Sequence, residues 1–166
     1  MTAGWWGQVS AETPSPGRGG EFEPKRLPLV RQTEGAGLTV IRVSSRALGP
    51  RVHVRVCVYD DVHAMRAAAD GFNGTTHVDA LGVTQATVDR SGRAVAVIVR
   101  LAVGHLGTQV VSHEMHHAAT ALYGAHVGDR PSRAAHLNHF NEPFAHLYSD
   151  LLARLVGRLY ALGFYA

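Results

Sequence analysis

Apolar and polar residues alternate with a period of two over the first patterned stretch of the chain. The valines of this stretch are every second residue and are separated by more polar side chains: Val52, Val54, Val56 and Val58. This period is typical of a strand with one buried face. The shorter apolar run Leu38–Val43 predicts a strand as well. Further on, Val83–Val88 and Ala94–Val103 flank the turn-like residues 89–93, which predicts a hairpin.

Three other segments have the pattern of helices. Asp60 and Asp61 suit the start of an alanine-rich helix over Val62–Asp70. Longer helices are expected over Thr108–Tyr123, with Thr108 as its cap and Gly124 at its end, and over Asn141–Leu162. The predicted order is strand, strand, helix, strand, strand, helix, loop, helix. This order predicts an α+β domain with a small, mostly antiparallel twisted sheet.

The composition narrows the class of protein. The chain has 166 residues, of which 46% are hydrophobic and 17% charged, which fits one folded domain and excludes wholesale disorder. Residues 1–37 are rich in proline and glycine, so we expect a mostly disordered segment there and a domain over residues 38–166. The net charge of +3 does not by itself indicate nucleic acid as a partner. The single Cys57 excludes an internal disulfide framework.

No apolar run approaches the roughly 18 residues of a membrane span. The first residues also lack the basic-then-apolar order of a signal peptide. The expected location is therefore the cytoplasm, without a membrane partner.

The most informative motif is His-Glu-Met-His-His at residues 113–117, an instance of H-E-x-x-H. On a helix, His113 and His117 lie one turn apart on the same face, where two imidazoles can share one Zn²⁺. Glu114 lies beside them and can act as the base that accepts a proton from water. The apolar positions of this helix fall on the opposite side: Val111, Met115, Ala118 and Leu122. The pattern therefore predicts a zinc site on the exposed side of the helix.

A catalytic zinc site needs three protein ligands and one open position. Residues 141–145 read Asn-Glu-Pro-Phe-Ala, and Pro143 is tolerated only in the first turn of a helix. Glu142 is thus expected at the start of the last helix, 25 residues after His117, and is the predicted third ligand.

The two motifs together resemble the gluzincin pattern, in which H-E-x-x-H is followed by a helix bearing Glu-x-x-Ala. Thermolysin-like peptidases and the small ImmA/IrrE-type proteases share this layout. The resemblance implies a minimal zincin fold with a backing helix, an H-E-x-x-H helix and a C-terminal glutamate helix. It also implies a zinc-dependent metallopeptidase that hydrolyses a protein or peptide through a zinc-activated water. In that scheme His113, His117 and Glu142 are zinc ligands and Glu114 is the general base.

Several alternatives stay open. A SprT-like site is similar but takes a later histidine as third ligand, here His126, His136 or His139. Because His126 follows His117 by only nine residues, His136 is the better candidate of these. In the gluzincin scheme the same two histidines are the candidates for the donor that stabilises the oxyanion, with Tyr148 behind them. His146 stands where many gluzincins have an aspartate that orients a ligand histidine, and Asp150 follows one turn later.

Two further expectations concern how the domain is used. By analogy with zincins that bind an extended substrate on the edge of the sheet, Ala94–Leu101 is the expected edge strand. The competing class is a zinc-binding interaction protein without catalysis. The presence of Glu114 argues against that class, since a structural zinc site has no need of a base.

Overall fold

The computed structural model describes residues 37–90, 94–128 and 141–165. These residues all belong to one compact unit, Arg31–Ala166. The predicted disordered segment lies outside the described residues except for Gly37, and so do His136 and His139. No helix in the described ranges is long and apolar enough to cross a membrane.

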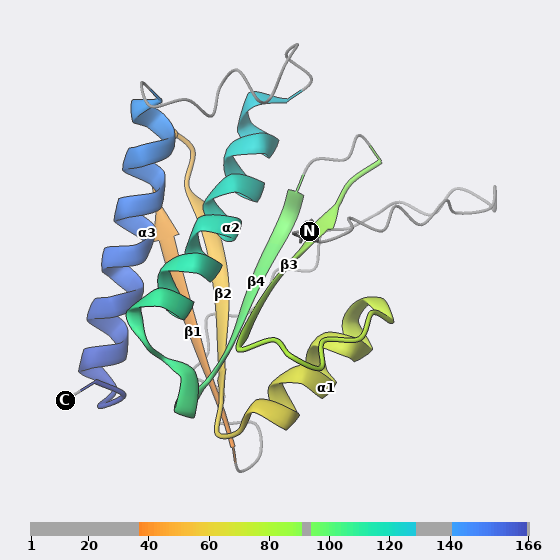
Figure 1. Ribbon diagram of the computed structural model, residues 1–166. Coiled ribbons are helices and arrows are strands. Elements are labelled where there is room, and N and C mark those ends of the chain that lie inside the picture. Colours follow the sequence, from red (N-terminus) through yellow and green to blue (C-terminus); the bar gives the residue numbers. More distant parts are fainter. Residues whose placement is uncertain (1–36, 91–93, 129–140, 166) are drawn as a thin grey trace, which may run out of the picture. The chain divides into compact units, whose positions relative to one another are not determined.

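Four strands form one mixed sheet, as Figure 1 shows. They are β1 (Leu38–Ser45), β2 (Val52–Tyr59), β3 (Gly82–Val88) and β4 (Ala94–Ala102), in the spatial order β1-β2-β4-β3. The β1–β2 and β3–β4 pairs are antiparallel, whereas β2 and β4 run parallel. The α+β class is thus confirmed, and the sheet is mixed because the chain crosses over between β2 and β4.

The prediction that Ala94–Leu101 forms an edge of the sheet is wrong. This segment belongs to β4, which lies between β2 and β3, and β3 is the edge strand of the described sheet on that side. The physical reason is the nearly continuous apolar sequence of β4, which needs cover on both faces. The sequence of β3 is more polar and includes Thr84 and Gln85, so it suits an edge.

The helices agree with the predicted ones except at their ends. Helix α1 (Val62–Asn73) begins at Asp61, whose side chain accepts hydrogen bonds from the amides of His63 and Ala64. Helix α3 (Glu142–Ala161) is capped by Asn141, which accepts from the amide of Phe144. A short 3₁₀ turn, η1 (Val103–His105), precedes α2 (Thr108–Val127).

The predicted ends of α2 need correction. Thr108 is its first residue rather than its cap, a position that Gly107 takes without a side-chain hydrogen bond. The helix also continues through Gly124 to Val127. It ends at Gly128, whose φ of 65° lies in the left-handed region that glycine tolerates.

The sheet lies between two helical layers. Helix α1 packs on one face through Met65 and Ala69, whereas α2 and α3 cover the other face. The larger core lies on the α2–α3 side, where the predicted stripe of α2 is confirmed as buried: Val111, Met115, Ala118 and Leu122. Four leucines of α3 are buried against it, at residues 147, 151, 155 and 159, and Phe144 is partly buried beside them. Helix α2 also packs against β3 and β4, so its H-E-x-x-H turn lies next to the β3 edge.

Candidate metal centre

Two histidines converge on the exposed side of α2. Their Nε2 atoms are 3.1 Å apart, and the ring centroids of His113 and His117 are separated by 4.6 Å. Both side chains are exposed, while Met115 and Ala118 on the other side of the helix are buried completely. The predicted division of this helix into a buried stripe and a histidine face is therefore confirmed.

The spacing of these two nitrogen atoms suits a shared zinc ion. Zinc–nitrogen bonds of about 2.0–2.1 Å at a tetrahedral angle place two ligand nitrogens about 3.3–3.4 Å apart. The observed 3.1 Å between the Nε2 atoms of His113 and His117 is within a few tenths of that value. Without metal, the same contact is a hydrogen bond between the two rings, and its length is compatible with two corners of a zinc tetrahedron.

His117 is suited to bind a metal as a neutral imidazole. Although its side chain reaches solvent, partial burial of the ring lowers its pKa, and the nearby His113 and His116 lower it further. A ligand histidine must give up its proton to bind metal. The lowered pKa keeps His117 unprotonated, and thus competent as a ligand, at more acidic pH than an ordinary histidine.

Glu114 is buried although it is the second residue of an exposed motif. It is only 6% exposed, and burial raises the pKa of its carboxyl group. A hydrogen bond from Thr84 of β3 opposes this rise, as does the nearby His113. The carboxyl group therefore lies in a protected position next to the histidine pair, and its pKa is shifted in the direction that suits a general base.

Thr84 and Gly82 of β3 form the surroundings of this carboxyl group. Thr84 Oγ1 lies 2.7 Å from Glu114 Oε2 and 2.9 Å from the main-chain oxygen of Glu114. A Cβ atom at Gly82 would lie 2.7 Å from Cγ of Glu114 and 3.0 Å from a methyl group of Val110. The Glu114 side chain thus occupies space that exists because residue 82 has no side chain.

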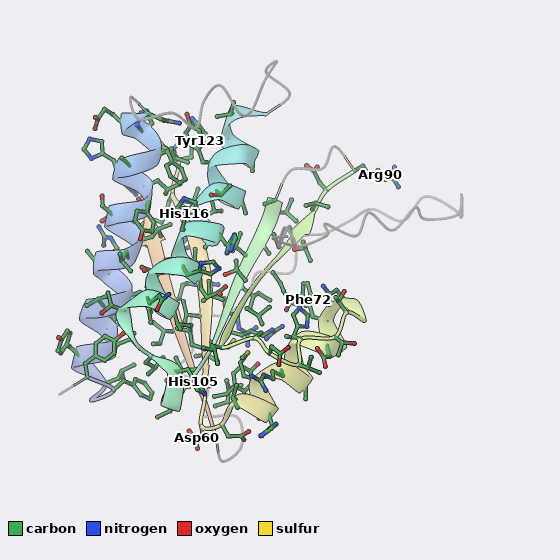
Figure 2. The ribbon with its side chains drawn as sticks, in the orientation of Figure 1. Asp60, Phe72, Arg90, His105, His116 and Tyr123 are labelled. Carbon is green, nitrogen blue, oxygen red and sulfur yellow. The ribbon has the colours of Figure 1, made fainter. Side chains whose placement is uncertain are left out.

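His116, to which the motif assigned no role, connects α2 to α3. Its ring lies 5.5 Å from that of Phe144 and 5.8 Å from that of Tyr148, centroid to centroid. Tyr123 packs on Phe144 about two turns further along α2, and Figure 2 shows His116 and Tyr123 on the side of α2 that faces α3. This aromatic cluster holds the start of α3 against the histidine helix.

Glu142 lies at the first position of α3, as predicted, but its side chain is exposed. Its Oε2 is 3.7 Å from Nε2 of His146, one turn along the same helix. The structure does not bring its carboxylate to His113 and His117, and the described residues include no group of three potential metal ligands. Asp150, the candidate for orienting a ligand, instead accepts a hydrogen bond from Arg154 at 2.7 Å.

Of the remaining candidate site residues, the structure describes Tyr148 but not His136 or His139. The hydroxyl group of Tyr148 lies 3.5 Å from the main-chain oxygen of Ser112, one residue before His113. His136 and His139 lie outside the described residues. Their predicted roles, as oxyanion donors or as an alternative third ligand, stay predictions.

Thr84 and Gly82 were not predicted as parts of the site. The strand pattern puts residues 82, 84 and 86 on one face of β3, but nothing in it shows that α2 crosses that face.

The comparisons with known protein families, curated proteins and solved structures find no match to this chain. The interpretation of the site therefore depends on its own residues.

Proposed function

We propose that the protein is a zinc-dependent metallopeptidase with its active site at the His113–His117 pair. The observation that carries the proposal is a buried carboxyl group directly beside two convergent imidazoles. A structural zinc site gains nothing from such a carboxyl group, because burying it costs stability. A hydrolase needs it, because a base of raised pKa can accept a proton from water near neutral pH.

Each residue has a separate task in this proposal. His113 and His117 hold the metal through their Nε2 atoms, which are already 3.1 Å apart. Bound zinc supplies a Lewis acid, which polarises the scissile carbonyl group and makes water more acidic. Glu114 accepts the proton of the attacking water on its carboxylate and then delivers it to the leaving amine.

The third ligand is proposed to be Glu142. It begins the helix that the aromatic cluster holds against α2, and among the described residues its exposed side chain has an ion-pair contact with His146 at 3.7 Å. The SprT-like alternative, with His136 or His139 as third ligand, gives a different order of zinc affinities among variants and is tested on that basis.

The free edge of β3 suggests how a substrate is held. Among the described strands β3 has no partner on its outer side, and it adjoins the turn of α2 that carries Glu114. An extended peptide can pair with such an edge through main-chain hydrogen bonds. The proposed substrate is accordingly an extended segment of a protein or peptide.

The proposal is tested with Glu114→Gln in the zinc-loaded full-length chain. The amide has nearly the same shape as the carboxylate but cannot accept the proton, so zinc content stays the same and peptide cleavage is lost. Cleavage products are identified by mass spectrometry from a proteome-derived peptide mixture. Equal cleavage by wild type and variant would remove Glu114 from the mechanism, and no cleavage by a zinc-loaded wild type would favour a zinc-binding protein without catalysis.

A further inference from the structure

We infer that Thr84 of β3 is a positioning residue that holds the Glu114 carboxyl group in its productive orientation. The inference rests on the proposed function and adds the edge strand to the catalytic apparatus. Its basis is the pair of contacts that one hydroxyl group makes to the two ends of the same glutamate. Thr84 Oγ1 is 2.7 Å from Oε2 and 2.9 Å from the main-chain oxygen of Glu114.

The two oxygens of the carboxyl group are in different surroundings. Oε2 is within hydrogen-bonding distance of Thr84. Oε1 accepts no hydrogen bond from the described residues, and Thr84 is the side chain that bonds to this carboxyl group. Thr84 therefore holds one oxygen and leaves the other free for the proton that the base has to accept.

The hydroxyl group is itself held rigidly. Thr84 pairs with Val99 of β4 inside the sheet, and a β-branched side chain in a strand has few rotamers. The single proton of the Thr84 hydroxyl group is shared between Oε2 and the main-chain oxygen of Glu114, so the hydroxyl group bridges the side chain and the backbone of the helix. A site group supported by a strand and a helix is placed more exactly than one supported by a loop.

Gly82 makes this arrangement possible. It lies two residues before Thr84 on the same face of β3, and its missing side chain leaves room for Cγ and Cδ of Glu114. The strand therefore both admits the glutamate side chain and binds its end. A threonine that merely filled space against α2 would not need a glycine of this kind beside it.

The test compares Thr84→Val, which keeps the shape and removes the hydroxyl group, with Thr84→Ser, which keeps the hydroxyl group. The substrate is a quenched fluorescent peptide selected from a random library by wild-type cleavage. We expect Thr84→Val to lower kcat about 10- to 100-fold, with KM and zinc content unchanged, because the base is misplaced by a fraction of an ångström to 1 Å. Thr84→Ser restores most of kcat.

The control is Thr76→Val, because Thr76 is exposed in the loop after α1, outside the proposed site and the β3 edge, and leaves kcat unchanged. A readout independent of activity comes from melting temperatures. Thr84→Val lowers that of the wild type by a few degrees, about the effect of one lost hydrogen bond, and has a smaller effect in a Glu114→Leu background.

The outcomes of these experiments distinguish the positioning role of Thr84 from the proposed peptidase function. A Thr84→Val variant that cleaves as fast as the wild type overturns the positioning role and leaves the proposed function intact. An equal loss in Thr84→Ser, or a change in KM alone, overturns it too. A zinc-loaded wild type that cleaves no peptide overturns the proposed function and this inference with it.

Discussion

Substitution of Gly82 by alanine tests how closely β3 and α2 approach at the site. The new Cβ would lie 2.7 Å from Cγ and 3.3 Å from Cδ of Glu114, and 3.0 Å from Cγ1 of Val110. Optimal carbon–carbon contacts are about 3.5–4.0 Å, so the Cγ contact is too short by about 1 Å. Both sides are constrained, since β3 is paired to β4 and Glu114 lies on a packed helix.

Overpacking of this kind costs about 1–3 kcal/mol. For a domain of this size, about 2 kcal/mol corresponds to a fall in melting temperature of roughly 6–10 °C. Because Glu114 supplies two of the three close contacts, most of the loss should disappear when its side chain is removed. A double-mutant cycle of Gly82→Ala and Glu114→Ala is therefore expected to give a coupling free energy of about 1–2 kcal/mol.

The assay is thermal and urea unfolding of the zinc-free chain, with Gly157→Ala as the matched control. Gly157 lies on the exposed side of α3, and a Cβ atom there would have nothing within 4 Å, so alanine should raise stability by about 0.5–1 kcal/mol. A Gly82→Ala variant as stable as the wild type would refute the close approach. A loss that persists unchanged without the Glu114 side chain would show that Glu114 does not occupy this space.

Three further predictions concern the site and the N-terminal segment. Burial raises the pKa of Glu114, so the ionised carboxylate destabilises the folded chain above the folded-state pKa. Glu114→Gln removes this charge and should raise the melting temperature of the zinc-free chain at pH 8. This gain in melting temperature should shrink as the pH falls through the folded-state pKa of Glu114. Glu142→Ala should weaken zinc binding strongly in a competition with a chromophoric chelator, whereas His136→Ala should keep the metal; a SprT-like site predicts the reverse order. Deleting residues 1–36 should leave the melting temperature nearly unchanged, and a fall of many degrees would make that segment a structural part of the domain.

Much of the fold could be predicted because its signals are local. The alternating valines of β2 and the buried leucines of α3 have the periods of their elements. Asp61 was recognisable as a helix cap from its own chemistry. The end of α2 was missed because Gly124 is tolerated inside a helix held by tertiary packing, and the termination at Gly128 depends on a positive φ that composition does not reveal.

The parts that could not be predicted depend on contacts between distant segments. The order of the strands follows from a parallel pairing of β2 with β4, and this pairing puts β3 at the edge. Thr84 reaches Glu114 across 30 residues of sequence, and Gly82 matters only because α2 crosses it. The spacing of the histidines is local, by contrast, so one turn of helix was enough to predict that His113 and His117 converge.

If His113 and His117 form a zinc centre, the zinc content of the purified chain depends on both of them. The protein is reconstituted with zinc, desalted and measured by elemental analysis, together with His113→Ala, His117→Ala and Glu114→Gln. About one zinc per chain is expected in the wild type and in Glu114→Gln, and a large loss in either histidine variant. A wild type without zinc after reconstitution, or histidine variants that keep the full amount, would contradict it.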